Sequence, residues 1–216
     1  MQIWLNSLDI KTLTLADQLG LLYGVTTNPS LIAKSELNLE ENIEAILKCH
    51  DKPIAIQVTA VDHAGIIEQA EVLSDLSERI IVKVPVTQEG LKAMHSLAHL
   101  RFQLMATAIF TPLQALFACR AGAAYIAPFY SRLKNPLETT KEIMRMLDHY
   151  RFETTLLVAS LKNEESLLDC FHLGAHAACL EDALFHTLIR DQSGTFEALD
   201  RFSKDWKKAK PSSLFS

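Results

Sequence analysis

Eight short apolar segments, spread along most of the chain, constrain the fold more than any other feature of this sequence. They are rich in Ile, Val, Leu and Ala and do not alternate with polar residues, which is typical of strands buried on both faces of a parallel sheet. We expect strands at residues 3–5, 23–25, 54–58, 80–84, 102–109, 123–127, 154–159 and 175–180.

The stretches between these segments have the periodicity of amphipathic helices. Two of them open with helix start signals: Thr-Pro-Leu-Gln at residues 111–114 and Asn-Pro-Leu-Glu at residues 135–138. Each offers an N-cap residue, a proline at the first helical position, and a Gln or Glu three residues after the cap. Strands and helices therefore alternate along the chain.

Such alternation is compatible with a closed barrel or with an open, doubly wound sheet. Eight strand-helix units favour the barrel. An open sheet usually carries a glycine-rich phosphate loop, and this chain has only 7 glycines and neither of the common patterns. We predict the α/β class, with a single-domain (β/α)₈ TIM barrel over residues 1–190. The 216 residues are near the lower end for a fold that typically takes about 250.

Residues 191–216 are predicted to form an extra C-terminal helix and tail. An amphipathic helix at residues 195–208 has Phe196, Leu199, Phe202 and Trp206 on one side. We expect this apolar stripe to pack on the protein's own barrel or on a neighbouring subunit.

Composition excludes several classes of function. The formal net charge of −5 comes from mixed charges with no long basic stripe, so we expect no nucleic-acid partner. No apolar run approaches the roughly 18 residues of a membrane span, and we see no signal peptide.

The scattered cysteines favour reduced thiols in a soluble, cytoplasmic protein. The spaced histidine pairs lack the Glu of H-E-x-x-H, so we expect no metal.

Lys83 is the most informative single residue. It lies among apolar neighbours near the end of the segment at residues 80–84. Burial disfavours the charged form of a lysine, so its pKa should fall, and a neutral amine attacks carbonyl groups. The alternative is a lysine at a strand end that extends into solvent. Active sites of these barrels gather at the C-terminal ends of the strands, which favours a catalytic role.

Longer motifs surround this lysine. They are GVTTNPS at residues 24–30, VKVPVTQEGL at 82–91, AGAAYIAPF at 121–129, ASLK at 159–162 and DW at 205–206. In these motifs the chain resembles the small transaldolase and fructose-6-phosphate aldolase family, in order and over essentially its whole length. The resemblance implies a homo-oligomer, commonly a decamer in this family, that acts on sugar phosphates without a cofactor.

The resemblance also implies a class I aldol mechanism, in which Lys83 forms a Schiff base with the C2 carbonyl of a ketose phosphate. Thr26 and Asn28 match residues that hold substrate hydroxyls, and Thr107 matches the threonine that helps to position the catalytic water.

A phosphate site is implied as well. Arg132 and Ser160 match the family's phosphate-binding pair, and Lys162 stands where relatives carry a second cation. An arginine with hydroxyl donors is a suitable phosphate ligand.

Three positions depart from the family pattern. Asn6 stands where relatives have an aspartate that takes the C4 hydroxyl proton, and an amide cannot accept that proton. Phe129 stands where the aldolase subgroup has tyrosine and the transaldolase subgroup phenylalanine. Gln57 stands where transaldolases have glutamate and the aldolase subgroup glutamine. Tyr130 is a substitute only if the strand ends before it, and Asp9 is expected in a loop or at a helix start.

Three hypotheses follow. The first is a transaldolase that moves a dihydroxyacetone unit between sugar phosphates, which Phe129 favours. The second is a fructose-6-phosphate aldolase-type enzyme that releases dihydroxyacetone, which Gln57 favours. The third is a weakened relative that binds a sugar phosphate without efficient turnover, which Asn6 favours.

Overall fold

A computed structural model describes residues 1–100 and 102–209 of the chain. The chain divides into two compact units, Met1–Phe185 and His186–Ser216. The boundary lies a few residues before the one predicted at residue 190. Residues 210–216 of the predicted tail lie outside the described residues.

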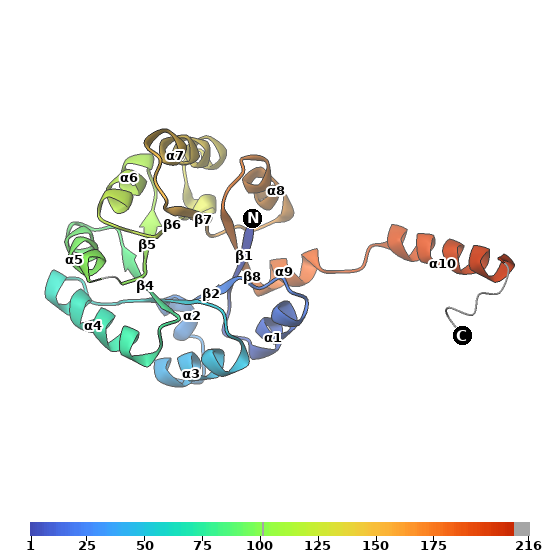
Figure 1. Cartoon of the computed structure of the whole chain (residues 1–216), viewed down its shortest axis with the longest axis horizontal. Coiled ribbons are helices and arrows are strands. Elements are labelled where there is room, and N and C mark those ends of the chain that lie inside the picture. The colour runs from blue at the N-terminus through green and yellow to red at the C-terminus, as the bar shows by residue number, and fades with distance from the viewer. Residues whose placement is uncertain (101, 210–216) are drawn as a thin grey trace. The chain divides into compact units, whose positions relative to one another are not determined.

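The first unit is a closed barrel, and Figure 1 shows its strands inside a ring of helices. In the described part of the chain, eight strands pair in parallel, each with the next in sequence, and β8 pairs with β1. The predicted (β/α)₈ barrel is therefore confirmed. The strands are β1 Gln2–Asn6, β2 Gly24–Thr26, β3 Ile54–Gln57, β4 Ile80–Pro85, β5 Leu104–Ile109, β6 Tyr125–Pro128, β7 Thr155–Val158 and β8 Ala177–Glu181.

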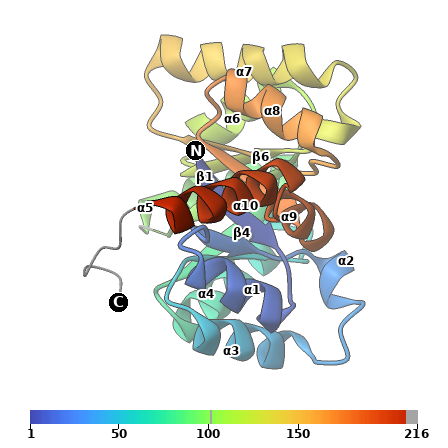
Figure 2. The ribbon, with the colours of Figure 1, turned by 90° about the vertical axis from the view of Figure 1, so that its right-hand side faces the viewer.

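Within the first unit, helices follow the strands and cover the barrel, with α7 and α8 on one side of it and α1 and α3 on the opposite side (Figure 2). Among residues 1–100 and 102–209, none of the helices has the length and apolarity that a membrane span requires. The helices are α1 Ile10–Gln18, α2 Pro29–Ile32, α3 Leu39–Cys49, α4 His63–Leu76, α5 Gln88–His99, α6 Pro112–Arg120, α7 Pro136–Tyr150, α8 Glu164–His172, α9 Asp182–Leu188 and α10 Ser193–Lys208, with a 3₁₀ turn at Tyr130–Arg132.

Both predicted helix starts are confirmed, with one difference in their capping. Thr111 caps α6 and accepts from the backbone nitrogen of Gln114. The amide of Gln114 accepts from the backbone nitrogen of Phe110 at 2.9 Å, one residue before the cap. Asn135 precedes α7 without a capping hydrogen bond from its side chain. Proline at the first turn is thus the signal that both helices share.

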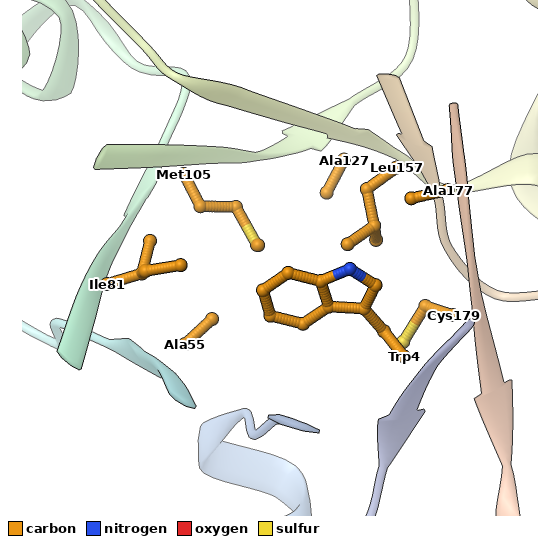
Figure 3. Packing of buried hydrophobic residues seen from close by; sticks show 8 residues of the cluster. All are labelled: Trp4, Ala55, Ile81, Met105, Ala127, Leu157, Ala177 and Cys179. Atoms are coloured by element: carbon orange, nitrogen blue, oxygen red, sulfur yellow. The ribbon is translucent and has the colours of Figure 1, made fainter. Parts of the chain in front are cut away.

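The barrel interior is centred on Trp4, whose indole is fully buried. Its neighbours come from strands all around the barrel, as Figure 3 shows. Alternate residues of a strand share a face, so the residue two positions after an inward-facing residue also faces inward. The inward cluster around Trp4 is Ala55, Ile81, Met105, Ala127, Leu157, Ala177 and Cys179.

This alternation carries polar side chains to the C-terminal mouth of the barrel. Asn6 follows Trp4 by two residues, Gln57 follows Ala55, and Lys83 follows Ile81. The strand register pairs Gln57 with Lys83. A hydrophobic layer thus supports the polar layer in which the sequence predicts chemistry.

The second unit contains α10, which agrees with the helix predicted at residues 195–208. Phe196, Leu199, Phe202 and Trp206 are each between 56% and 58% exposed. Packing of this stripe against other surfaces stays a prediction.

Candidate active site

Lys83 is a buried lysine on the inner face of β4. Only 5% of the residue is exposed, and its Nζ donates to the backbone carbonyl of Thr27 at 3.0 Å. Burial lowers the pKa of Lys83 below its ordinary value, and the charge of a Cys179 thiolate opposes this change. A desolvated amine that donates to a neutral carbonyl is suited to nucleophilic attack on a carbonyl carbon.

Asn6, Thr26 and Asn28 form one hydrogen-bonded group beside this lysine. The Oδ1 of Asn6 accepts from the Nδ2 of Asn28 at 3.0 Å and from the Thr26 hydroxyl at 3.4 Å. The other end of the Asn28 amide caps α2, where its Oδ1 accepts from the backbone nitrogen of Leu31 at 3.0 Å. The N-cap thus fixes the orientation of an amide that faces the mouth of the barrel.

Thr107 lies on β5 and supplies a buried polar atom. Its hydroxyl is buried and has no hydrogen-bond partner within the residues that the structure describes. Such a group usually holds a water or a ligand. The next residue, Ala108, has a left-handed backbone with φ of 57°, and the pairing of β5 with β6 shifts there. Irregular backbone of this kind is common at functional sites because it changes the direction of the side chains.

Phe129 lies directly after β6 and forms an isolated bridge with Ala159. Its ring packs edge-on against Phe110, with ring centroids 5.8 Å apart, and the guanidinium of Arg132 lies 5.0 Å from its centroid. Arg132 is exposed at the end of the 3₁₀ turn. The aromatic ring therefore positions the arginine at the mouth of the barrel.

Tyr130 is not a substitute acid–base group, although the strand does end before it. Its hydroxyl donates to the Asp169 carboxylate on α8 at 2.7 Å, and the residue is only 6% exposed. Burial and the contact with Asp169 both raise the pKa of Tyr130. Asp9 is likewise occupied, since it caps α1 and accepts from Lys11 and Thr12.

The remaining predicted residues lie in the loop after β7. Ser160 has a left-handed backbone with φ of 63°, and its hydroxyl lies 2.8 Å from that of Ser131. Lys162 forms an ion pair with Glu181, with Nζ and Oε1 at 2.5 Å. Glu181 was not predicted as a site residue, although a carboxylate directly after the strand predicted at residues 175–180 is a signal that the sequence contains.

Comparison with models of known families identifies the family of the chain. The model of the transaldolase/fructose-6-phosphate aldolase family matches residues 3–213. The chain belongs to this family.

Curated relatives of this family member match over nearly their whole length. A probable transaldolase of Citrifermentans bemidjiense is 37% identical over 96% of this chain and 99% of its own. Probable transaldolases of Coprothermobacter proteolyticus and Clostridioides difficile are 35% and 36% identical, over 97% and 98% of their lengths and 96% and 97% of this chain.

A likeness to one solved structure concerns the fold alone. The crystal structure of inosine 5′-monophosphate dehydrogenase from Legionella pneumophila superposes with a TM-score of 0.60 at 15% identity, over 85% of this chain and 58% of that chain. Barrels of this kind carry many unrelated activities, so the site residues must support any function assigned to this family member.

Proposed function

We propose that this chain is a transaldolase that transfers a dihydroxyacetone unit between sugar phosphates through a Schiff base on Lys83. The observation that carries the proposal is the burial of the Lys83 amine on the inner face of β4, at the end of the barrel where such enzymes place their chemistry. Membership of the family supports the same chemistry.

The neutral amine of Lys83 attacks C2 of a ketose phosphate, and loss of water leaves an iminium ion. The iminium then accepts the electron pair of the C3–C4 bond when that bond breaks, which releases an aldose phosphate and leaves an enamine on the lysine. The enamine attacks the aldehyde carbon of a second aldose phosphate, and hydrolysis frees the new ketose and Lys83. A covalent intermediate of this kind divides one difficult step into easier ones.

Other side chains at the mouth of the barrel have roles in this scheme. Thr26 and Asn28 hold substrate hydroxyls beside the lysine, in line with their shared contact with Asn6. The buried Thr107 hydroxyl, with Gln57 on the strand beside Lys83, positions the water that leaves and returns.

The substrate phosphate is bound by charged and hydroxyl groups at the same end of the barrel. Arg132, held against the Phe129 ring, supplies the main cation, and Ser160 supplies a hydroxyl. Arginine is suited to this task because its fork of N–H groups donates two hydrogen bonds to a phosphate.

Transfer is favoured over simple cleavage because Phe129 has no hydroxyl. A phenol at this position would be able to protonate the enamine and so release dihydroxyacetone, as we infer for the aldolase subgroup. Phe129 instead packs against Phe110, and the enamine stays available for an acceptor aldehyde.

Borohydride trapping in the presence of fructose 6-phosphate tests the proposal. We expect a reduced three-carbon adduct on Lys83, located by intact mass and peptide mapping, and its loss when an acceptor aldose phosphate is added before the borohydride. Lys83→Met is the control and should give no adduct. The absence of any adduct on Lys83 with every ketose phosphate tried would overturn the proposal.

A second candidate is a family member that binds sugar phosphates and turns them over poorly. Asn6 favours it, because the amide has no capacity to accept the C4 hydroxyl proton and general base catalysis is typically worth about 10²–10⁴-fold in rate. A six-carbon adduct on Lys83 without a three-carbon adduct would indicate this candidate.

We also propose that the protein is a homo-oligomer in which the apolar stripe of α10 contacts a neighbouring subunit. Helix α10 is amphipathic, and the residues of its apolar stripe are more than half exposed. Covering an apolar surface of this kind stabilises a protein in water.

A further inference from the structure

Glu181 is the last residue of β8 and the register partner of Asn6 on β1. Cys179, two residues earlier on the same strand, belongs to the cluster around Trp4 in the barrel interior. Because alternate residues of a strand share a face, Glu181 faces the barrel axis at the mouth, beside Asn6. Its side chain is 47% exposed, so substrate and solvent can reach the carboxylate.

This position matters because the site otherwise has an amide where a carboxylate is needed. The Oδ1 of Asn6 already accepts from Asn28 and Thr26, and an amide oxygen is too weak a base to take a hydroxyl proton. Neighbouring strands lie about 4.8 Å apart, and a glutamate side chain is one methylene longer than an aspartate. A carboxylate at the end of β8 can therefore reach the space above Asn6 at the mouth of the barrel.

Two interactions link Glu181 to the rest of the candidate site, an ion pair and an electrostatic effect on a buried thiol. Its Oε1 pairs with Nζ of Lys162 at 2.5 Å, in the loop where a phosphate site is expected. Burial raises the pKa of the Cys179 thiol. The Thr26 hydroxyl and the charge of Lys83 lower this pKa, whereas the Glu181 carboxylate raises it further. The Glu181 carboxylate thus interacts electrostatically with the Cys179 thiol, which in turn interacts with Lys83.

The ion pair also provides a way to release the carboxylate. Lys162 and Glu181 are both about half exposed, and exposed ion pairs hold their partners weakly. A substrate phosphate that binds Lys162 competes with Glu181 for the same ammonium group. Binding of the phosphate would then free the carboxylate at the moment when the sugar chain enters the mouth of the barrel.

We propose that Glu181 is the acid–base carboxylate of the Schiff-base reaction and takes the place of the aspartate that Asn6 replaces. This inference rests on the function proposed above. In cleavage, the C4 hydroxyl gives its proton to the Glu181 carboxylate, its oxygen becomes the carbonyl of the leaving aldehyde, and the C3–C4 electron pair passes to the Lys83 iminium to form the enamine. In the transfer step, the protonated Glu181 returns a proton to the oxygen of the acceptor aldehyde.

Glu181→Gln tests the role directly. We expect the variant to form the imine but not to break the C3–C4 bond, so borohydride should trap a six-carbon adduct on Lys83 while the three-carbon adduct and kcat fall by about 10²–10⁴-fold. The double variant Asn6→Asp, Glu181→Gln restores a carboxylate on β1 and should recover the three-carbon adduct.

Two further variants separate this role from simpler ones. Lys162→Met keeps Glu181, so it should raise KM for the phosphorylated donor while leaving the ratio of three-carbon to six-carbon adduct unchanged. Glu138→Gln removes a carboxylate from another exposed ion pair, with Lys141 on α7, and should behave as the wild type.

Two outcomes would overturn the proposal while leaving the Schiff-base function in place. One is a Glu181→Gln variant that still gives the wild-type yield of three-carbon adduct. The other is a Lys162→Met variant that loses cleavage as Glu181→Gln does, which would make Glu181 only a tether for Lys162. If the wild type forms no adduct on Lys83, the proposed function fails and the role of Glu181 falls with it.

Discussion

The Nζ of Lys83 on β4 lies 3.0 Å from the carbonyl oxygen of Thr27, directly after β2, so one hydrogen bond links β4 to the end of β2 past the intervening strand β3. The lysine is buried and this carbonyl is a neutral partner. The charged form of Lys83 therefore loses hydration without gaining a carboxylate, and burial lowers its pKa. Burial of Lys83 therefore lowers the stability of the fold at pH values where the free amine is protonated.

Lys83→Met should increase stability at neutral pH. The pKa of Lys83 is lowered in the folded state, so the unfolded chain binds the proton more strongly, and wild-type stability rises as pH increases from the lowered pKa toward the ordinary value of 10.5. We expect the variant to exceed the wild type by about 1–3 kcal/mol at pH 7. Urea unfolding should show this difference shrinking as the pH approaches 10. Lys34→Met, at an exposed position, is the control and should show little change.

Arg132→Ala should weaken binding of the phosphorylated donor. A charge-assisted hydrogen bond is worth about 1.5–3 kcal/mol, so KM for fructose 6-phosphate should rise by about 10–100-fold. KM for unphosphorylated fructose should stay unchanged. Arg145→Ala removes an exposed arginine from α7 and serves as the control. Equal effects on both donors would contradict a phosphate role for Arg132.

Phe129→Tyr should shift the products from transfer toward release of dihydroxyacetone. The new hydroxyl is placed at the mouth of the barrel, where it can protonate the enamine, and a positioned acid is typically worth about 10²-fold or more. Dihydroxyacetone formed without an acceptor measures the change. Phe110→Tyr adds a hydroxyl to the ring 5.8 Å away and should not reproduce it. Equal release from both variants would remove the specific role of position 129.

Gly24→Ala should destabilise the barrel core. A Cβ at Gly24 would lie 2.5 Å from a ring carbon of Trp4, which is fully buried among the side chains of the barrel interior. Overpacking of this kind typically costs about 1–3 kcal/mol in the free energy of unfolding. Thermal or urea unfolding measures it. Gly194→Ala, where a Cβ meets nothing within 4 Å, is the matched control, and a similar loss there would refute the argument from Trp4.

Charges on the α10 stripe should reduce the assembly size. Phe196 and Phe202 are 57% and 58% exposed, and an aspartate at each would oppose burial in a subunit interface. We expect the mass of the Phe196→Asp, Phe202→Asp variant, measured by light scattering, to fall below that of the wild type. Glu197→Gln, on the same helix, should keep the wild-type mass. An unchanged mass in the double variant would exclude this stripe from the interface.

Local sequence patterns determined most of the fold. Strands buried on both faces need continuous apolar residues, so the eight segments stand out, and every predicted strand lies within two residues of an observed one at each end. Lys83 also stood out in the sequence, because an ionisable residue inside such a segment is costly to bury and is a candidate for a functional site. The prolines at residues 112 and 136 marked helix starts for the same local reason.

Contacts between distant segments were decided only by the tertiary structure. Tyr130 is adjacent to Phe129, yet its hydroxyl reaches Asp169, 39 residues away, because the chain turns at the end of β6. Lys162 and Glu181 meet because β7 and β8 are neighbours. Glu181 lies beside Asn6 because the barrel closes by pairing its last strand with its first. Periodicity specifies the direction of a side chain within its own strand, whereas closure of the barrel specifies which strands are neighbours, and it is closure that brings a carboxylate to the place where the first strand lacks one.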